Sequence, residues 1–160
     1  MIKRLIKLEM ILSSLLFFIP LILFLIDGEL RPSISNYAYM DDNHFFVALL
    51  VVAGSMFITN GSLWNRQFYN IILGVALVGV ACTPHLDIPV WHYIFASVFF
   101  VGSLSIMIIN RSFTRLVMAI LIVVGMSGHF LFGFYSLLWA EWIGILPITV
   151  HFTLKSLSKK

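Results

Sequence analysis

The chain has 160 residues, of which 61% are hydrophobic and only 11% are charged, and its formal net charge is +3. Soluble domains usually carry about 25% charged residues. This composition excludes a soluble enzyme, a nucleic-acid-binding domain and a disordered chain, and it predicts a small all-α integral membrane protein. The positive excess is small and spread over many sites, so no nucleic-acid partner is expected.

The spacing of the charges predicts where the membrane spans lie. Five stretches without a charged residue are 17, 23, 20, 23 and 25 residues long. A helix that crosses a bilayer needs about 20 mostly apolar residues. The chain is therefore predicted to form one membrane domain over residues 1–160, a bundle of six transmembrane helices. The predicted spans are about residues 10–26, 44–59, 68–82, 91–109, 114–130 and 135–153.

Polar breaks separate these spans. The first and longest loop runs over residues 27–43. The second span is expected to stop at Asn60-Gly61-Ser62, a turn signal, and the third at Thr83-Pro84. Residues 116–154 form a stretch of 39 residues with one charge. Because a single helix of that length would reach about 58 Å, two spans are predicted there, with a turn between Gly128 and Gly133.

The basic residues predict the orientation in the membrane. With six spans, nine of the ten basic residues share one side with both chain ends: Lys3, Arg4, Lys7, Arg66, Arg111, Arg115, Lys155, Lys159 and Lys160. Lysine and arginine are retained on the cytoplasmic side of short loops. Both termini are therefore predicted to be cytoplasmic, in a multi-pass protein of the bacterial inner membrane.

Several possible metal ligands fall on the predicted outer side. They are His44, His85, Asp87, His92 and His129. Imidazole and carboxylate groups suit zinc, so a membrane-embedded, zinc-dependent hydrolase is one alternative. No two of these residues have the spacing of a His-Glu-x-x-His pair. The same residues would also be explained as interfacial histidines that cap helix ends.

Glu141 is the charge that the predicted topology does not explain, because it lies inside the sixth span. A carboxylate within a membrane helix costs about 2.5–3.5 kcal/mol, and such groups usually face the bundle interior or water. The structural explanation is a neutral, hydrogen-bonded glutamic acid near the interface. The functional alternatives are a polar pocket for lipid headgroups and, in an oligomer of the chain, a pore or transporter whose path Glu141 lines.

Three short segments resemble a known membrane family. Pro32-Ser33-Ile34-Ser35-Asn36 resembles the Pro-x-Ile-Ser-Asp element of the damage-regulated autophagy modulator family, whose relatives include proteins of GPI-lipid remodelling. His92-x-x-x-Ala96 with Phe99-Phe100, and the pair Glu141-Trp142, are similar to two further motifs of that family. Uncharacterised bacterial membrane proteins share this plan. Asn36 stands where the family has aspartate. The resemblance implies a six-helix bundle linked to lipids, without a settled catalytic mechanism.

These observations favour a small, lipid-associated, non-enzymatic membrane protein. Its outer pocket would engage lipid headgroups through Ser35, Asn36, His92 and Glu141. Membrane lipids are the expected partners, and homo-oligomerisation belongs to the pore alternative. No cofactor is expected, and zinc enters only with the hydrolase alternative.

Overall fold

The computed structural model describes residues 2–63, 67–109 and 112–157, and all regular structure in these residues is helical. The six α-helices are α1 (Ile2–Asp27), α2 (His44–Leu63), α3 (Tyr69–Cys82), α4 (Pro89–Ile109), α5 (Phe113–Phe130) and α6 (Leu137–Leu157). A short 3-10 helix, η1 (Ile34–Tyr39), lies between α1 and α2. The predicted all-α class is confirmed.

The local sequence accounts for several helix ends. Gly28 follows α1 with φ of 78°, and Gly133 lies after α5 with φ of 63°. Glycine reaches these angles without the strain that a Cβ atom causes. Pro89 occupies the first position of α4, where its missing N–H would have had no helical partner. Ser112 caps α5, because its Oγ accepts a hydrogen bond from the backbone N–H of Arg115 at 3.4 Å.

Several helices differ from their predicted bounds. α1 begins at Ile2 rather than near Met10, and α2 continues through Asn60-Gly61-Ser62 to Leu63. The prediction that these three residues form a turn was wrong. A Cβ atom on Gly61 would lie 2.7 Å from Cγ1 of Ile71 in α3, so this glycine permits close helix packing instead.

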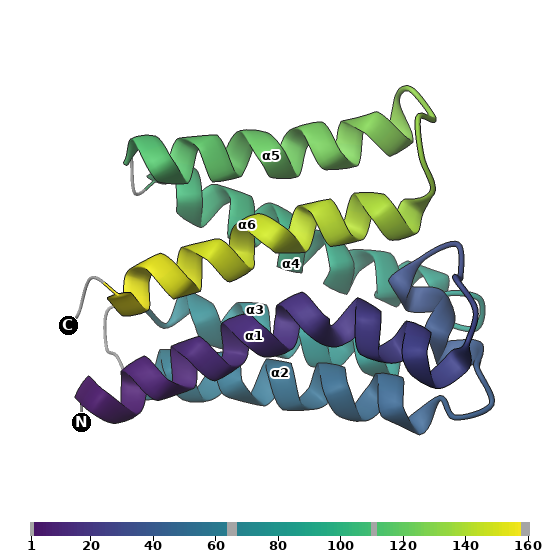
Figure 1. Cartoon of the computed structure of the whole chain (residues 1–160), viewed down its shortest axis with the longest axis horizontal. Coiled ribbons are helices and arrows are strands. Elements are labelled where there is room, and N and C mark those ends of the chain that lie inside the picture. Colours follow the sequence, from purple (N-terminus) through teal and green to yellow (C-terminus); the bar gives the residue numbers. More distant parts are fainter. Residues whose placement is uncertain (1, 64–66, 110–111, 158–160) are drawn as a thin grey trace.

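The helices form a closed ring. Each α-helix contacts the next one along the chain, and α6 returns to contact α1 (Figure 1). Both chain ends lie at the same end of the bundle, here termed the terminal end. The opposite end, termed the distal end, holds the connecting segments 28–43, 83–88 and 131–136.

The outer surface of the bundle is apolar, as in a membrane protein. Large apolar side chains such as Leu25, Val90 and Phe113 are 69%, 67% and 84% exposed. Soluble monomers rarely expose extended apolar surfaces of this kind. By length and composition, α1, α2, α4, α5 and α6 are each able to cross a membrane, whereas the apolar α3 has only 14 residues.

The segment between α1 and α2 folds back into the distal end of the ring. Ile34, Tyr37 and Met40 are buried, and the Tyr37 hydroxyl donates a hydrogen bond to the carbonyl of Glu29 at 3.0 Å. Burial raises the pKa of Tyr37. The sequence predicted an outer loop here, but the segment closes this end of the ring with side chains of its own.

Asp27 and Arg31 hold the start of this segment against the end of α1. The guanidinium of Arg31 donates two hydrogen bonds to the Asp27 carboxylate, at 2.6 and 2.8 Å. Those hydrogen bonds raise the pKa of Arg31. The pair fixes the direction in which the chain leaves α1.

Candidate functional site

A cavity of about 300 Å³ lies at the distal end, between η1, α4, α5 and the start of α6. Its polar lining includes Ser33, Ser35, Asn36, His85, His92, Ser97 and Glu141. The four residues predicted to form a headgroup pocket, Ser35, Asn36, His92 and Glu141, are all among them. The structure therefore brings these four together from three separate elements.

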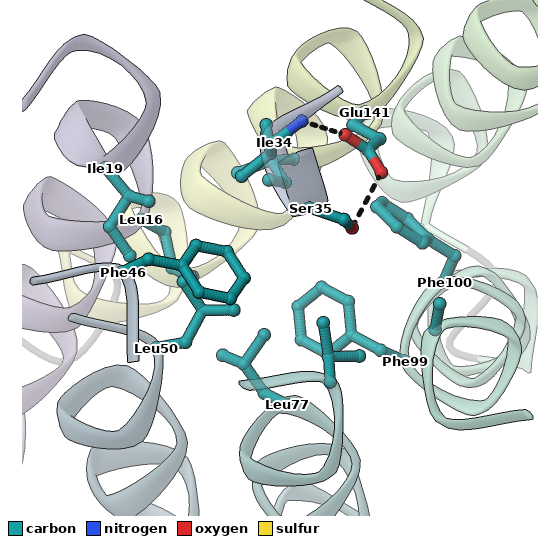
Figure 2. Close-up of a pocket in the computed structure, with 13 residues that line it drawn as sticks. Leu16, Ile19, Ile34, Ser35, Phe46, Leu50, Leu77, Phe99, Phe100 and Glu141 are labelled. Atoms are coloured by element: carbon teal, nitrogen blue, oxygen red, sulfur yellow. Dashed lines mark hydrogen bonds between the residues drawn. The ribbon is translucent and has the colours of Figure 1, made fainter. Parts of the chain in front are cut away.

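A second, smaller cavity of about 50 Å³ lies inside the ring beside the first. Figure 2 shows its apolar lining, with Phe46 and Phe99 below and Ser35 and Glu141 at its upper edge. A space of this size accommodates only a few water-sized molecules. Ser35 and Glu141 also line the larger cavity, so they separate the core of the ring from it.

The Glu141 carboxylate joins α6 to η1. Its Oε2 accepts a hydrogen bond from the backbone N–H of Ile34 at 2.6 Å, and its Oε1 lies 3.5 Å from the Ser35 hydroxyl (Figure 2). In the reverse direction, the backbone N–H of Leu138 donates to the carbonyl of Pro32 at 2.7 Å. These bonds satisfy free backbone groups at the starts of both helices, which otherwise have no intrahelical partner.

His92 lies on the first turns of α4 and is 3% exposed. Its Nδ1 is 2.6 Å from the carbonyl oxygen of Thr83, and its Nε2 is 3.0 Å from Oγ of Ser35. Because a carbonyl oxygen only accepts hydrogen bonds, Nδ1 must carry a proton. In the neutral ring Nε2 is then an acceptor, to which the Ser35 hydroxyl donates.

His85 lies next to His92 on the cavity wall. The two ring centroids are 5.6 Å apart, and the rings of Tyr39 and His85 form a T-shaped pair with centroids 5.4 Å apart. Nδ1 of His85 is buried and finds no hydrogen-bond partner in the described part of the chain. Buried polar atoms are rarely unpartnered in folded proteins, so this nitrogen is a candidate contact for a ligand.

The remaining predicted metal ligands do not line the cavity. His44 lies against the ring of Phe45, Asp87 accepts a hydrogen bond from the Tyr39 hydroxyl at 3.5 Å, and Nδ1 of His129 bonds to the carbonyl of Tyr135 at 2.8 Å. Residues 2–63, 67–109 and 112–157 contain no group of three His, Cys, Asp or Glu side chains placed to hold a metal ion. The zinc-dependent hydrolase therefore stays a prediction.

Sequence reasoning missed a second polar cluster, at the terminal end. Glu9 is fully buried, and its Oε1 lies 3.2 Å from Nζ of Lys155 and 3.2 Å from Nδ2 of Asn60. Asn70 donates in turn to Oδ1 of Asn60 at 2.6 Å, and Lys155 also donates to the side chain of Gln67. The cluster joins α1, α2, α3 and α6.

A sequence signal for Glu9 was present. Leu5, Glu9, Leu12 and Leu16 recur at intervals of three and four residues, which places them on one face of a helix. All four are buried against the bundle. An acid on an otherwise leucine-rich face predicts a buried charge with a partner.

A family model described as a family of unknown function (DUF7103) matches residues 18–156. The chain belongs to this DUF7103 family. The match includes every cavity residue from Ser33 to Glu141, whereas Glu9 precedes it. None of the curated proteins or solved structures compared with the chain matches it.

DUF7103 membership assigns no activity to the cavity. It does not bear on the resemblance to the damage-regulated autophagy modulator family, which stays a prediction. The oligomeric pore or transporter also stays a prediction, since it concerns several copies of the chain. Function must therefore be argued from the chemistry of the site.

Proposed function

We propose that the distal cavity binds one membrane lipid, with its polar headgroup against Ser35, His92 and Glu141 and its acyl chain along α4 and α5. The observation that carries this proposal is the change of polarity along one cavity. Serine, asparagine, histidine and glutamate side chains of η1, of the start of α6 and of the segment around the start of α4 line one part. The rest is lined mainly by apolar side chains such as Phe100 and Met126, with Ser97 among them. A lipid has the same two-part chemistry.

Access from the side supports this function. Tyr93 and Val101 on α4 and Phe130 on α5 line the cavity and are 56%, 58% and 67% exposed. Those side chains face the surroundings of the bundle, which are lipid for a membrane protein. A volume of about 300 Å³ is at the lower limit of small-molecule pockets, so part of the acyl chain would remain in the bilayer.

The polar end supplies groups suited to a headgroup. Nδ1 of His85 finds no hydrogen-bond partner in the described residues, and the Glu141 carboxylate borders the same space. A headgroup that bonds to His85 would offset the cost of leaving a buried nitrogen unpartnered. The apolar part of the cavity would gain from displacing water with a hydrocarbon chain.

The membrane arrangement belongs to the same proposal: six spans, both termini in the cytoplasm and the cavity at the outer side of the bacterial inner membrane. The terminal end holds the starts of α1 and α5 (Figure 1), and the described basic residues Lys3, Lys7 and Arg115 belong to these first turns. Arg66, Arg111, Lys159 and Lys160 lie outside the described residues. α3 is about 21 Å long at 1.5 Å per residue, shorter than the hydrocarbon core of about 30 Å. Its contacts with both α2 and α4 support its place in the bundle.

Filling the cavity tests the function. Ala96 lines it and makes no side-chain hydrogen bond, so Ala96→Phe removes space without removing a polar partner. Phospholipid that stays bound through purification would be counted by native mass spectrometry. We expect the wild-type chain to carry about one lipid and Ala96→Phe to lose at least about tenfold in occupancy, because its ring takes the volume of the chain or headgroup.

Val98→Phe is the matched control. Val98 is on the same helix, is 37% exposed and does not line the cavity. This variant should retain the lipid occupancy of the wild-type chain. Equal occupancy in the wild type, Ala96→Phe and Val98→Phe would contradict binding in this cavity.

A further inference from the structure

Ser35, His92 and the carbonyl of Thr83 form a hydrogen-bonded series at the edge of the cavity. The Thr83 oxygen holds Nδ1 of His92 at 2.6 Å, and Nε2 of His92 lies 3.0 Å from Oγ of Ser35. A nucleophile within about 2.6–3.2 Å of a base, with the base oriented by a third group, is the arrangement of serine-type acyl transfer. Here a backbone carbonyl takes the orienting position that aspartate has in the Ser-His-Asp triad.

The single hydrogen of the Ser35 hydroxyl has two acceptors within reach. Nε2 of His92 is 3.0 Å away, whereas Oε1 of Glu141 is 3.5 Å away. A hydrogen bond at 3.5 Å is close to the limit of an effective interaction. The geometry therefore favours donation to His92, which is the direction that activates the serine oxygen.

The surroundings of Ser35 also fit a reacting carbonyl group. Ser35 and the neighbouring Asn36 both line the large cavity. The Ser33 hydroxyl donates to Oδ1 of Asn36 at 2.6 Å, so this bond does not use the amide nitrogen of Asn36, the residue that follows Ser35 in η1. Asparagine side chains serve as oxyanion donors in acyl-transfer enzymes.

We propose that Ser35 is the nucleophile of an acyl-ester hydrolase, with His92 as the general base and the ester of a bound acyl lipid as substrate. This rests on the proposed lipid binding and goes beyond it. Asn36 donates to the developing oxyanion. Glu141 is a positioning residue, because it holds the first turn of η1, which carries Ser35, against α6.

The reaction balances with water as the second substrate. Oγ of Ser35 attacks the ester carbonyl carbon while its proton moves to Nε2 of His92. The carbonyl carbon–oxygen single bond then breaks, and His92 returns the proton to the departing alkoxide, which leaves as an alcohol. Water, deprotonated by His92, attacks the carbonyl carbon of the acyl-serine ester. The bond from that carbon to Oγ breaks, His92 returns the proton to Oγ, and the carboxylic acid and the Ser35 hydroxyl are formed.

An active-site-directed fluorophosphonate tests the nucleophile in the intact chain, purified in detergent. The probe forms a phosphonate ester with an activated serine and releases fluoride. We expect labelling of the wild type, with the adduct located on Ser35 by mass spectrometry, and no labelling of Ser35→Ala. His92→Gln should label at least about tenfold more slowly, since glutamine cannot accept the proton.

Two controls separate catalysis from folding. Ser105→Ala removes an exposed serine of α4, and His44→Gln removes an exposed histidine of α2; both should label like the wild type. If His92 acts as the base, the rate at which the probe labels Ser35 should rise with pH as His92 loses its proton. A histidine with a purely structural role would not produce this dependence of the labelling rate on pH. A helical circular-dichroism spectrum and a melting temperature in detergent equal to those of the wild type show that His92→Gln is still folded.

The outcomes distinguish this proposal from the lipid-binding function. An unlabelled wild type, or Ser35→Ala labelled at the wild-type rate, overturns the acyl-ester hydrolase. If such a chain still binds phospholipid in a way that Ala96→Phe abolishes, the lipid-binding function stands without catalysis. If phospholipid binding is also absent, both proposals fail.

Discussion

Two acidic residues inside apolar helices are accommodated in different ways. Glu141 accepts a hydrogen bond from the backbone of η1, whereas the fully buried Glu9 lies 3.2 Å from the ammonium group of Lys155. Removing one partner of a buried ion pair leaves an uncompensated charge, which costs about 3–5 kcal/mol. Replacing both partners by apolar residues of similar volume often costs far less stability.

Lys155→Met should therefore lower the free energy of unfolding by about 3–5 kcal/mol, because the buried Glu9 carboxylate loses the ammonium group that lies 3.2 Å from its Oε1. In the double variant Glu9→Gln/Lys155→Met, the decrease in the free energy of unfolding should be smaller than the sum of the decreases in the two single variants. We expect a difference of at least about 1 kcal/mol, as for other residues in contact. The measurement is an unfolding titration in mixed micelles.

Lys7→Met is the control for this cycle, since Lys7 lies on the exposed side of α1. Its free energy of unfolding should stay within about 0.5 kcal/mol of the wild type. Strictly additive effects of the Glu9 and Lys155 replacements would show that the ion pair does not contribute to stability.

The sequence alone indicated part of the candidate site. Ser35 and Asn36 were selected in the predicted first outer loop, in a segment that resembles a family motif. His92 was selected at the start of the fourth predicted span and Glu141 as a charge within the sixth, and all four line one cavity. The carbonyl of Thr83, which orients His92, could not be predicted, because backbone direction in the segment after α3 depends on tertiary packing. Glu9 was missed, although the spacing of Glu9 with the leucines around it already indicated a buried helical face.

At the level of elements, the short α3 is held by unusually close contact with α2. A Cβ atom on Gly54 would lie 2.7 Å from the carbonyl oxygen of Gly74, and one on Gly74 would lie 2.5 Å from that of Gly54. Small residues let the backbones of membrane helices approach closely and gain van der Waals contact. This contact compensates for the short apolar length of α3.

Gly54→Ala should destabilise the protein by about 1–3 kcal/mol, because the added carbon meets backbone atoms that move only with the whole helix. At Gly102 the nearest atom to an added Cβ is the end of the Leu73 side chain, which is able to rotate away. Gly102→Ala is therefore the matched control, and its loss of stability should be smaller. Thermal unfolding in detergent compares the two, and equal melting temperatures would refute tight α2–α3 packing.

The helices themselves were predictable, because uncharged apolar runs of about 20 residues have few other stable structures in a membrane. The 3-10 helix η1 could not be predicted from the sequence. Its burial depends on hydrogen bonds to the distant Glu141 and on packing of Tyr37, neither of which leaves a periodic pattern in a six-residue segment. The glycine at position 61 was misread for a related reason, since a turn and a helix contact both favour glycine.

For the whole molecule, the orientation in the membrane is open to a direct test. With six spans and cytoplasmic termini, a C-terminal alkaline phosphatase fusion should be inactive in bacterial cells, and a C-terminal green fluorescent protein fusion should fluoresce. A phosphatase fused after Asp42, at the distal end, should be active, because that segment is predicted to face outward. An active C-terminal phosphatase would contradict the six-span arrangement.

Closure of the ring by its first and last helices sets an order for biogenesis. α1 meets α6 through the hydrogen bond from Ser13 to the carbonyl of Thr149 at 2.8 Å and that from Ser156 to the carbonyl of Ile6 at 3.1 Å. The ribosome makes α1 first and α6 last. The ion pair between Glu9 and Lys155 therefore forms only after the five α-helices that follow α1 have been synthesised. Insertion of α6 is thus the late step that completes the burial of Glu9 and seals the bundle.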